Sequence, residues 1–86
     1  MPTISIFYGI IIQMFWEDHS PPHFHARYEK YKISINIRTL AVMRGAMPPR
    51  ALSLILEWAL QNQQSLLEDW ELCQKNQPPH KITPLS

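Results

Sequence analysis

Two neighbouring stretches of alternating polar and apolar residues constrain the fold of this chain more than any other feature. In residues 23–28 the even positions are apolar or aromatic and the odd positions are His or Arg, whereas in residues 31–38 the odd positions are the apolar ones. A side-chain period of two is typical of a strand that has one face buried. We therefore predict a strand in each of these stretches.

The two residues between these stretches, Glu29 and Lys30, are the right number for a tight hairpin turn. Such a turn places Phe24 opposite Ile35 and His25 opposite Ser34. Residues that lie directly opposite each other share a face of the sheet, so this register makes one face wholly apolar and the other wholly polar. A slip by one residue would mix the two faces. We therefore expect an antiparallel pair in this register.

Other extended segments are predicted on both sides of this pair. Residues 3–7 and 10–16 are rich in β-branched and aromatic residues and are separated by Tyr8-Gly9, which suits a second hairpin. A shorter extended piece covers residues 40–44, and residues 81–85 can return as an edge segment. The pattern thus predicts an antiparallel sheet of four to five strands.

The second half of the chain reads as helical. Pro48-Pro49 is a suitable opening, because the first turn of a helix tolerates proline. The stretch 61–64, rich in Gln and Asn, interrupts the apolar spacing, and Ser65 with Glu68 forms a capping-box pattern before a second apolar stripe. Either two helices or one bent helix fits. The residues with apolar helical spacing are Leu52, Ile55, Leu56, Ala59, Leu66, Leu67, Trp70 and Cys73.

The predicted fold class is α+β: a single small domain, residues 1–86, with one or two C-terminal helices packed on the apolar face of the sheet. Trp58 and Leu60 lie off the apolar stripe, so we expect them, with the bend at 61–64, to form an exposed patch that contacts a partner. The residues expected in the core are Phe24, Ala26, Ile33, Ile35 and Ile37 from the sheet, with Leu52, Ile55, Leu56, Leu66 and Trp70 from the helices.

Composition narrows the class of protein. A hydrophobic content of 45% argues against disorder, and a formal net charge of +1 gives no overall attraction to nucleic acid or to a membrane surface. The lone Cys73 excludes an intramolecular disulfide and a multi-cysteine zinc site, which suits a reducing compartment. No apolar run approaches the roughly 20 residues that cross a bilayer, and no signal-peptide pattern is visible. We expect a cytoplasmic protein.

Residues 18–25, Asp-His-Ser-Pro-Pro-His-Phe-His, hold three of the four histidines. His23 and His25 share one side of the predicted strand about 6.5–7 Å apart, close enough to converge on one metal ion or one phosphate, and we expect both to be at least partly accessible to solvent. Asp18 and His19 lie on the loop that enters the strand. The cluster lacks a recognised metal-ligand spacing, and the sequence requires no cofactor, although Zn or Ni fits these donors. The candidate metal ligands are Asp18, His19, His23 and His25.

The same polar face combines imidazoles with cations and small hydrogen-bonding groups, a combination that suits an anionic ligand such as a nucleic-acid backbone. The simpler interpretation is also open, because an antiparallel sheet normally leaves one face in water. The sequence therefore leaves three readings: a solvated face, an anion site and a metal site. The candidate anion-binding residues are His19, His23, His25, Arg27, Asn36 and Arg38.

Several motifs together resemble the prokaryotic family called domain of unknown function 4160. They are Met-Pro-Thr-Ile at the start, Phe7-Tyr8-Gly9-Ile10, the segment 18–25, Pro48-Pro49-Arg50-Ala51-Leu52, Glu57-Trp58-Ala59 and Ile82-Thr83-Pro84-Leu85. The resemblance implies a small α+β protein that is often encoded beside a short protein of domain of unknown function 2442. Such pairs look like toxin–antitoxin or regulatory cassettes. The family brings no known activity, so it assigns no catalytic residue.

Three functional hypotheses follow. The first is a non-enzymatic, regulatory component of such a two-gene cassette, which binds another small protein encoded nearby, contacts nucleic acid or forms a homodimer, without a membrane partner. The second is a small nuclease or phosphodiesterase that uses His23 and His25 as acid and base. The third is a metal-binding protein that uses the histidine cluster. Whether the protein is an enzyme stays open at this stage.

Overall fold

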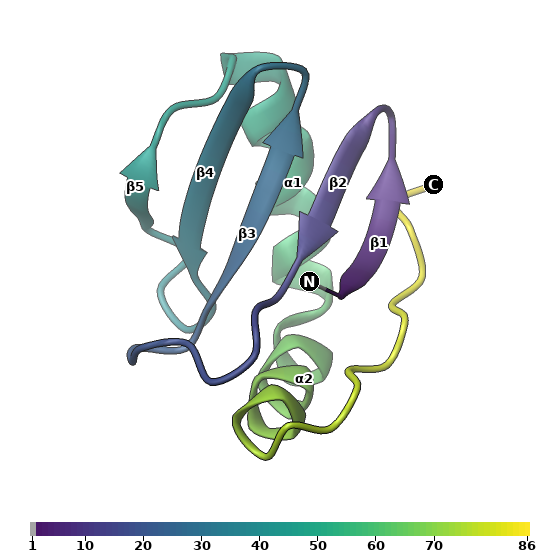
Figure 1. Cartoon of the computed structure of the whole chain (residues 1–86). Coiled ribbons are helices and arrows are strands. Elements are labelled where there is room, and N and C mark those ends of the chain that lie inside the picture. The colour runs from purple at the N-terminus through teal and green to yellow at the C-terminus, as the bar shows by residue number, and fades with distance from the viewer. Residues whose placement is uncertain (1) are drawn as a thin grey trace.

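The chain forms a five-stranded antiparallel sheet followed by two helices, so the predicted α+β class is confirmed (Figure 1). The computed structural model describes residues 2–86, and Met1 of the Met-Pro-Thr-Ile motif lies outside them. Each strand pairs with the next one in sequence, in the order β1-β2-β3-β4-β5. The elements are β1 (Thr3–Phe7), β2 (Ile10–Gln13), β3 (His23–Tyr28), β4 (Tyr31–Asn36), β5 (Val42–Gly45), α1 (Pro49–Gln61) and α2 (Gln63–Gln74).

The central hairpin has the register that the alternation predicts. Phe24 pairs with Ile35 and His25 with Ser34 across β3 and β4. Glu29, the first of the two turn residues, has a φ of 55°, the positive φ that the hairpin turns of types I′ and II′ both require at this position. Parity and the two-residue turn were sufficient together, because the turn length fixes the pairing and a shift by one residue would mix apolar and polar side chains on each face.

In the view of Figure 1, α1 lies behind the sheet and α2 lies below the lower ends of the strands, and the opposite face of the sheet carries no helix. Phe24 is fully buried beneath α1, where its ring meets the ring of Trp58 edge-on at 5.9 Å between centroids. The prediction that Trp58 contacts a partner is wrong: its side chain is 0% exposed, and its Nε1–H donates to the carbonyl of Thr83 at 2.9 Å. Leu60 is exposed as expected.

The helical region is divided into two helices rather than bent. Asn62, between α1 and α2, has a φ of −129°, and its side-chain amide donates to the carbonyl of Trp58 at 2.7 Å. The predicted capping box is absent, because α2 begins at Gln63 and Ser65 therefore lies inside the helix. No helix within residues 2–86 combines the length and the apolar character needed to cross a bilayer.

Four predicted extended segments have other bounds in the structure or are absent. The piece expected at residues 40–44 forms β5 at Val42–Gly45. The second strand stops at Gln13, and β4 stops at Asn36, whose side-chain oxygen accepts the N–H groups of Arg38 and Thr39 and so forms a turn. Residues 81–85 form no strand. Ile82 nevertheless donates its backbone N–H to the carbonyl of Ile4 at 2.8 Å, which brings the C-terminal segment against β1.

Candidate metal centre

The loop between β2 and β3 is held in place by the C-terminal end of α2. The backbone N–H of Glu17 donates to the carbonyl of Cys73 at 3.3 Å, and the side chain of Gln74 donates to the carbonyl of Asp18 at 3.1 Å. A further hydrogen bond joins the side chains of Asn76 and Glu17. These bonds fix the segment that carries Asp18 beside the first residues of β3.

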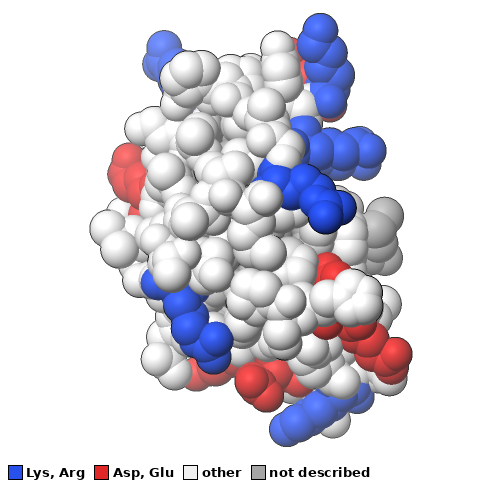
Figure 2. Space-filling model, turned by 90° about the vertical axis from the view of Figure 1, so that its left-hand side faces the viewer, with Lys and Arg blue, Asp and Glu red and all other residues white. Residues whose placement is uncertain are grey.

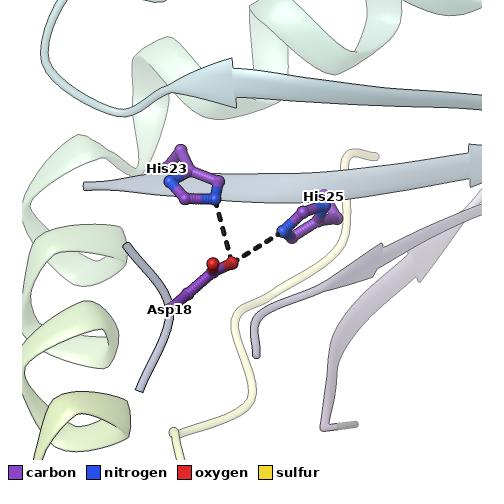
Figure 3. A group of neighbouring side chains, drawn as sticks. All are labelled: Asp18, His23 and His25. Atoms are coloured by element: carbon purple, nitrogen blue, oxygen red, sulfur yellow. Dashed lines mark hydrogen bonds and ion pairs between the residues drawn. The ribbon is translucent and has the colours of Figure 1, made fainter. Parts of the chain in front are cut away.

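Asp18, His23 and His25 converge at this point (Figure 3). One carboxylate oxygen of Asp18, Oδ2, lies 3.0 Å from Nε2 of His23 and 3.1 Å from Nε2 of His25. One ligand atom from each of the three residues lies within 4.8 Å of the others. The loop therefore adds a carboxylate to the two imidazoles that the parity of β3 places on one side of the strand.

The two histidines differ in burial. His23 is only 7% exposed, and its ring lies 5.2 Å from the ring of Trp70 on α2. The prediction that His23 is partly accessible is wrong, because α2 reaches the beginning of β3, where His23 lies. His25 is partly exposed as expected, stacks on the ring of Phe15 at 3.9 Å between centroids, and places Nδ1 3.3 Å from the hydroxyl of Ser34.

The carboxyl group of Asp18 stays ionised at neutral pH. Its partial burial by itself would raise its pKa, but the hydrogen bonds from the His25 side chain and from the backbone N–H of His19, at 2.8 Å, outweigh this effect. The nearby imidazole of His23 acts in the same direction, so the pKa lies below its ordinary value. The site thus contains a fixed negative charge between two imidazoles.

The hydrogen bonds of His23 determine where one of its protons lies. Its Nδ1 is 2.7 Å from the carbonyl oxygen of Pro21, and a carbonyl oxygen can only accept, so Nδ1 carries the hydrogen. In neutral His23, Nε2 then has a lone pair directed at the carboxylate oxygen of Asp18. Because Nε2 of His23 and Oδ2 of Asp18 would then both be acceptors, a cation must lie between them: either a second proton on His23 or a metal ion.

A hollow of about 300 Å³ opens beside the triad. The imidazole of His19 does not belong to the converging group, although His19 lines the hollow and its backbone orients Asp18. Three of the four predicted metal ligands are thus brought together. The residues that line the hollow are Asp18, His19, Ser20, His23, His25, Ser34, Met43 and Arg44.

The other candidate anion-binding residues have different places. Arg27 lies on the same face and lines an adjoining hollow with His25. Asn36 is occupied by the turn that ends β4, and Arg38 is exposed there and lines neither hollow. Arg44 was not among the candidate site residues, yet it lines both hollows from β5. Its position depends on an irregular β4–β5 register that no parity rule predicts.

The sheet with two helices and a histidine–aspartate cluster define a small α+β protein with a candidate metal centre. The chain belongs to the family described as Domain of unknown function (DUF4160), whose model matches residues 9–71. This range contains the whole triad, whereas the resembling segments at residues 1–4 and 82–85 fall outside it. No curated protein and no solved structure matches the chain.

Proposed function

We propose that this protein binds a divalent transition-metal ion through Asp18, His23 and His25. The observation that supports the proposal is the convergence of two Nε2 atoms on one carboxylate oxygen, at 3.0 and 3.1 Å, while Nδ1 of His23 is occupied by the carbonyl of Pro21. Histidines that bind metals commonly donate their second N–H to a backbone carbonyl in this way. The bond to Pro21 would orient the ring and leave Nε2 free for the ion.

The donor set selects the type of metal. Two imidazole nitrogens and one carboxylate suit Zn²⁺, Ni²⁺ or Fe²⁺, whereas Mg²⁺ and Ca²⁺ prefer oxygen ligands throughout. Three protein ligands leave at least one coordination position open, which is the arrangement of catalytic rather than structural zinc sites. Small movements of the three side chains would bring their donor atoms onto one ion, because the two nitrogen–oxygen distances, 3.0 and 3.1 Å, are similar to those between neighbouring ligands of one ion.

Isothermal titration calorimetry of the chelator-treated protein with Zn²⁺ and Ni²⁺ tests this proposal. We expect one ion per chain, with affinity reduced at least tenfold in Asp18→Asn and in His25→Ala. His80→Ala is the matched control, because His80 is exposed and outside the cluster. A wild-type protein that binds neither ion, or an affinity that is equal in all four proteins, would contradict the proposal.

A second function is supported by a separate surface. We propose that a small protein encoded nearby binds along β5, which would make the chain a regulatory component of a two-gene cassette. Every residue of β5 is exposed, and β5 is an edge strand, so its outer backbone groups are open to pairing with another strand. Val42 and Met43 add apolar surface, with 46% and 43% exposure.

Co-expression with the product of the neighbouring gene, followed by gel filtration, tests the second proposal. Val42→Lys should abolish co-elution. Ile6→Lys, a change on the opposite edge strand at a residue that is 56% exposed, should leave co-elution unchanged. Equal loss in both variants, or no complex with the wild-type protein, would count against β5 as the binding surface.

A further inference from the structure

Three side chains form a row across the sheet face that carries no helix. Ser34 of β4 pairs with His25 of β3 on one side and with Arg44 of β5 on the other. Strands lie about 4.8 Å apart, so the backbones of His25 and Arg44 are separated by about 10 Å, with the short side chain of Ser34 between them. The small serine therefore leaves a hollow that is bounded by a triad histidine and an arginine.

Two hollows, each of about 300 Å³, share His25, Ser34 and Arg44. The first contains the triad, and the second is also lined by Arg27 and Lys32. Basic side chains gather on the upper part of the right-hand side in Figure 2, and acidic side chains lie below them. Within residues 2–86, none of the side chains of Arg27, Lys32 and Arg44 forms an ion pair with a carboxylate. These cations are thus available to an anion.

We propose that this double hollow binds a small-molecule phosphomonoester, with a phosphate oxygen on the open position of the metal ion and the remaining oxygens on Arg44. The inference rests on the proposed metal binding. Phosphate suits both partners, because a guanidinium donates two parallel hydrogen bonds to its oxygens and the ion accepts a negatively charged ligand. Arg27 and Lys32 supply further positive charge around the same ligand.

The size and lining of the space favour a small molecule over a polymer. Pockets for small ligands begin at about 300 Å³, which is the size of each hollow. Phe15, stacked on His25, lines the second hollow and offers an aromatic ring to the organic part of the ligand. A phosphomonoester presents a doubly charged terminal group, whereas each phosphodiester of a nucleic acid carries a single charge.

The test measures phosphate binding separately from metal binding. Calorimetry first establishes the zinc affinity of the wild-type protein, of Arg44→Gln and of Arg38→Gln. Each zinc-loaded and each metal-free protein is then titrated with phenyl phosphate, inorganic phosphate and a single-stranded oligonucleotide. Arg38→Gln is the control, because Arg38 is an exposed arginine that lines neither hollow.

We expect zinc-loaded wild-type protein to bind phenyl phosphate, with at least tenfold weaker binding in Arg44→Gln and unchanged binding in Arg38→Gln. Zinc affinity should be equal in all three proteins. In the Co²⁺-loaded protein, phenyl phosphate should change the visible absorption spectrum, since direct coordination alters the ligand field of the ion.

The titrations distinguish failure of the metal proposal from failure of the phosphate inference. A protein that binds zinc but not phenyl phosphate overturns the phosphate inference alone, and the absence of zinc binding overturns the metal proposal together with the metal–phosphate contact. Equal phosphate binding with and without zinc also overturns that contact. Tight binding of the oligonucleotide with no binding of phenyl phosphate would assign the hollow to a polymer and overturn the small-molecule inference.

Discussion

At the scale of single residues, His23 and His25 show how one side of a strand can carry two different environments. Both project toward Asp18, yet His23 lies against Trp70 with little exposure, and His25 is covered mainly by Phe15. The difference arises because α2 reaches the beginning of β3 and not its middle. His23 is therefore part of the packed structure as well as of the candidate site.

This difference gives the first prediction, for the metal-free protein in the presence of a chelator. His23→Ala should lower the free energy of unfolding by about 1–3 kcal/mol, because it leaves the carbonyl of Pro21 without its donor and removes packing against Trp70. His25→Ala should cost less, since its side chain is 24% exposed. Urea denaturation measures both values, and a larger loss for His25→Ala would contradict the assignment of His23 to the packed structure.

Asp69 gives a second prediction at this scale. Its carboxyl group is 1% exposed; Oδ1 accepts the N–H of His80 at 2.8 Å, whereas Oδ2 has no partner within residues 2–86. Burial raises the pKa of the Asp69 carboxyl group above its ordinary value of 3.8. This effect exceeds that of the hydrogen bond from the backbone of His80, which lowers the pKa. The folded state therefore holds its proton to higher pH than the unfolded state, so this group lowers stability progressively as pH rises through the folded pKa.

Asp69→Asn keeps an oxygen for the N–H of His80 and removes the charge. The variant should therefore be more stable than the wild-type protein at pH 7. The gain should shrink as pH falls through the folded pKa toward 4, because the carboxyl group of the folded wild-type protein then takes up its proton. Urea denaturation of both proteins from pH 4 to 8 measures the gain in the free energy of unfolding. The contributions of the other titrating groups are the same in both proteins and cancel in the difference. A gain that is independent of pH would rule out the charge as its cause.

At the scale of elements, the parts that the sequence predicted are those that depend on local pairing. The β3–β4 register follows from parity and turn length, and the same parity predicts that His23 and His25 share a face. The burial of His23 could not be predicted, because it depends on the direction of α2 after the break at Asn62. Arg44 was missed as a site residue for a similar reason, since the β4–β5 pairing contains an irregularity between Ser34 and Ile35.

The end of β5 gives the third prediction. Gly45 has a φ of +88°, and a Cβ added there would lie 2.1 Å from the backbone oxygen of Lys32. Gly9 also has a positive φ, of +79°, but its added Cβ would meet only the ring of Tyr28 at 3.5 Å. Gly9→Ala should cost about 1–2 kcal/mol, the usual penalty for a left-handed alanine. Gly45→Ala should cost more, because the backbone of β4 or β5 must also shift.

Since β5 carries Arg44, Gly45→Ala should also weaken phenyl phosphate binding while zinc affinity stays unchanged. Chemical denaturation and calorimetry on the same preparations measure both effects. Equal costs for the two alanine variants would show that β5 adapts freely, and it would then be too mobile to position Arg44.

At the scale of the whole molecule, the C-terminal segment joins parts that are distant in sequence. The backbone N–H groups of His80 and Ile82 donate to Asp69 on α2 and to Ile4 on β1. The carbonyl of Thr83 accepts the indole N–H of Trp58 on α1 at 2.9 Å. Figure 1 shows this segment, in yellow, passing from α2 along the β1 side of the sheet. It thus links both helices to the first strand, although it has no secondary structure of its own.

The last prediction follows from this arrangement. Ile82 is 8% exposed, so Ile82→Ala should lower the free energy of unfolding by about 2–4 kcal/mol. Deletion of residues 80–86 should cost more, because it also leaves the buried indole N–H of Trp58 without an acceptor and opens the edge of β1. Leu60→Ala is the control, since Leu60 is 66% exposed and should change stability by no more than about 0.5 kcal/mol. Urea denaturation followed by tryptophan fluorescence measures all three, and a truncated protein as stable as the wild type would mean that the sheet and helices hold together without the C-terminal segment.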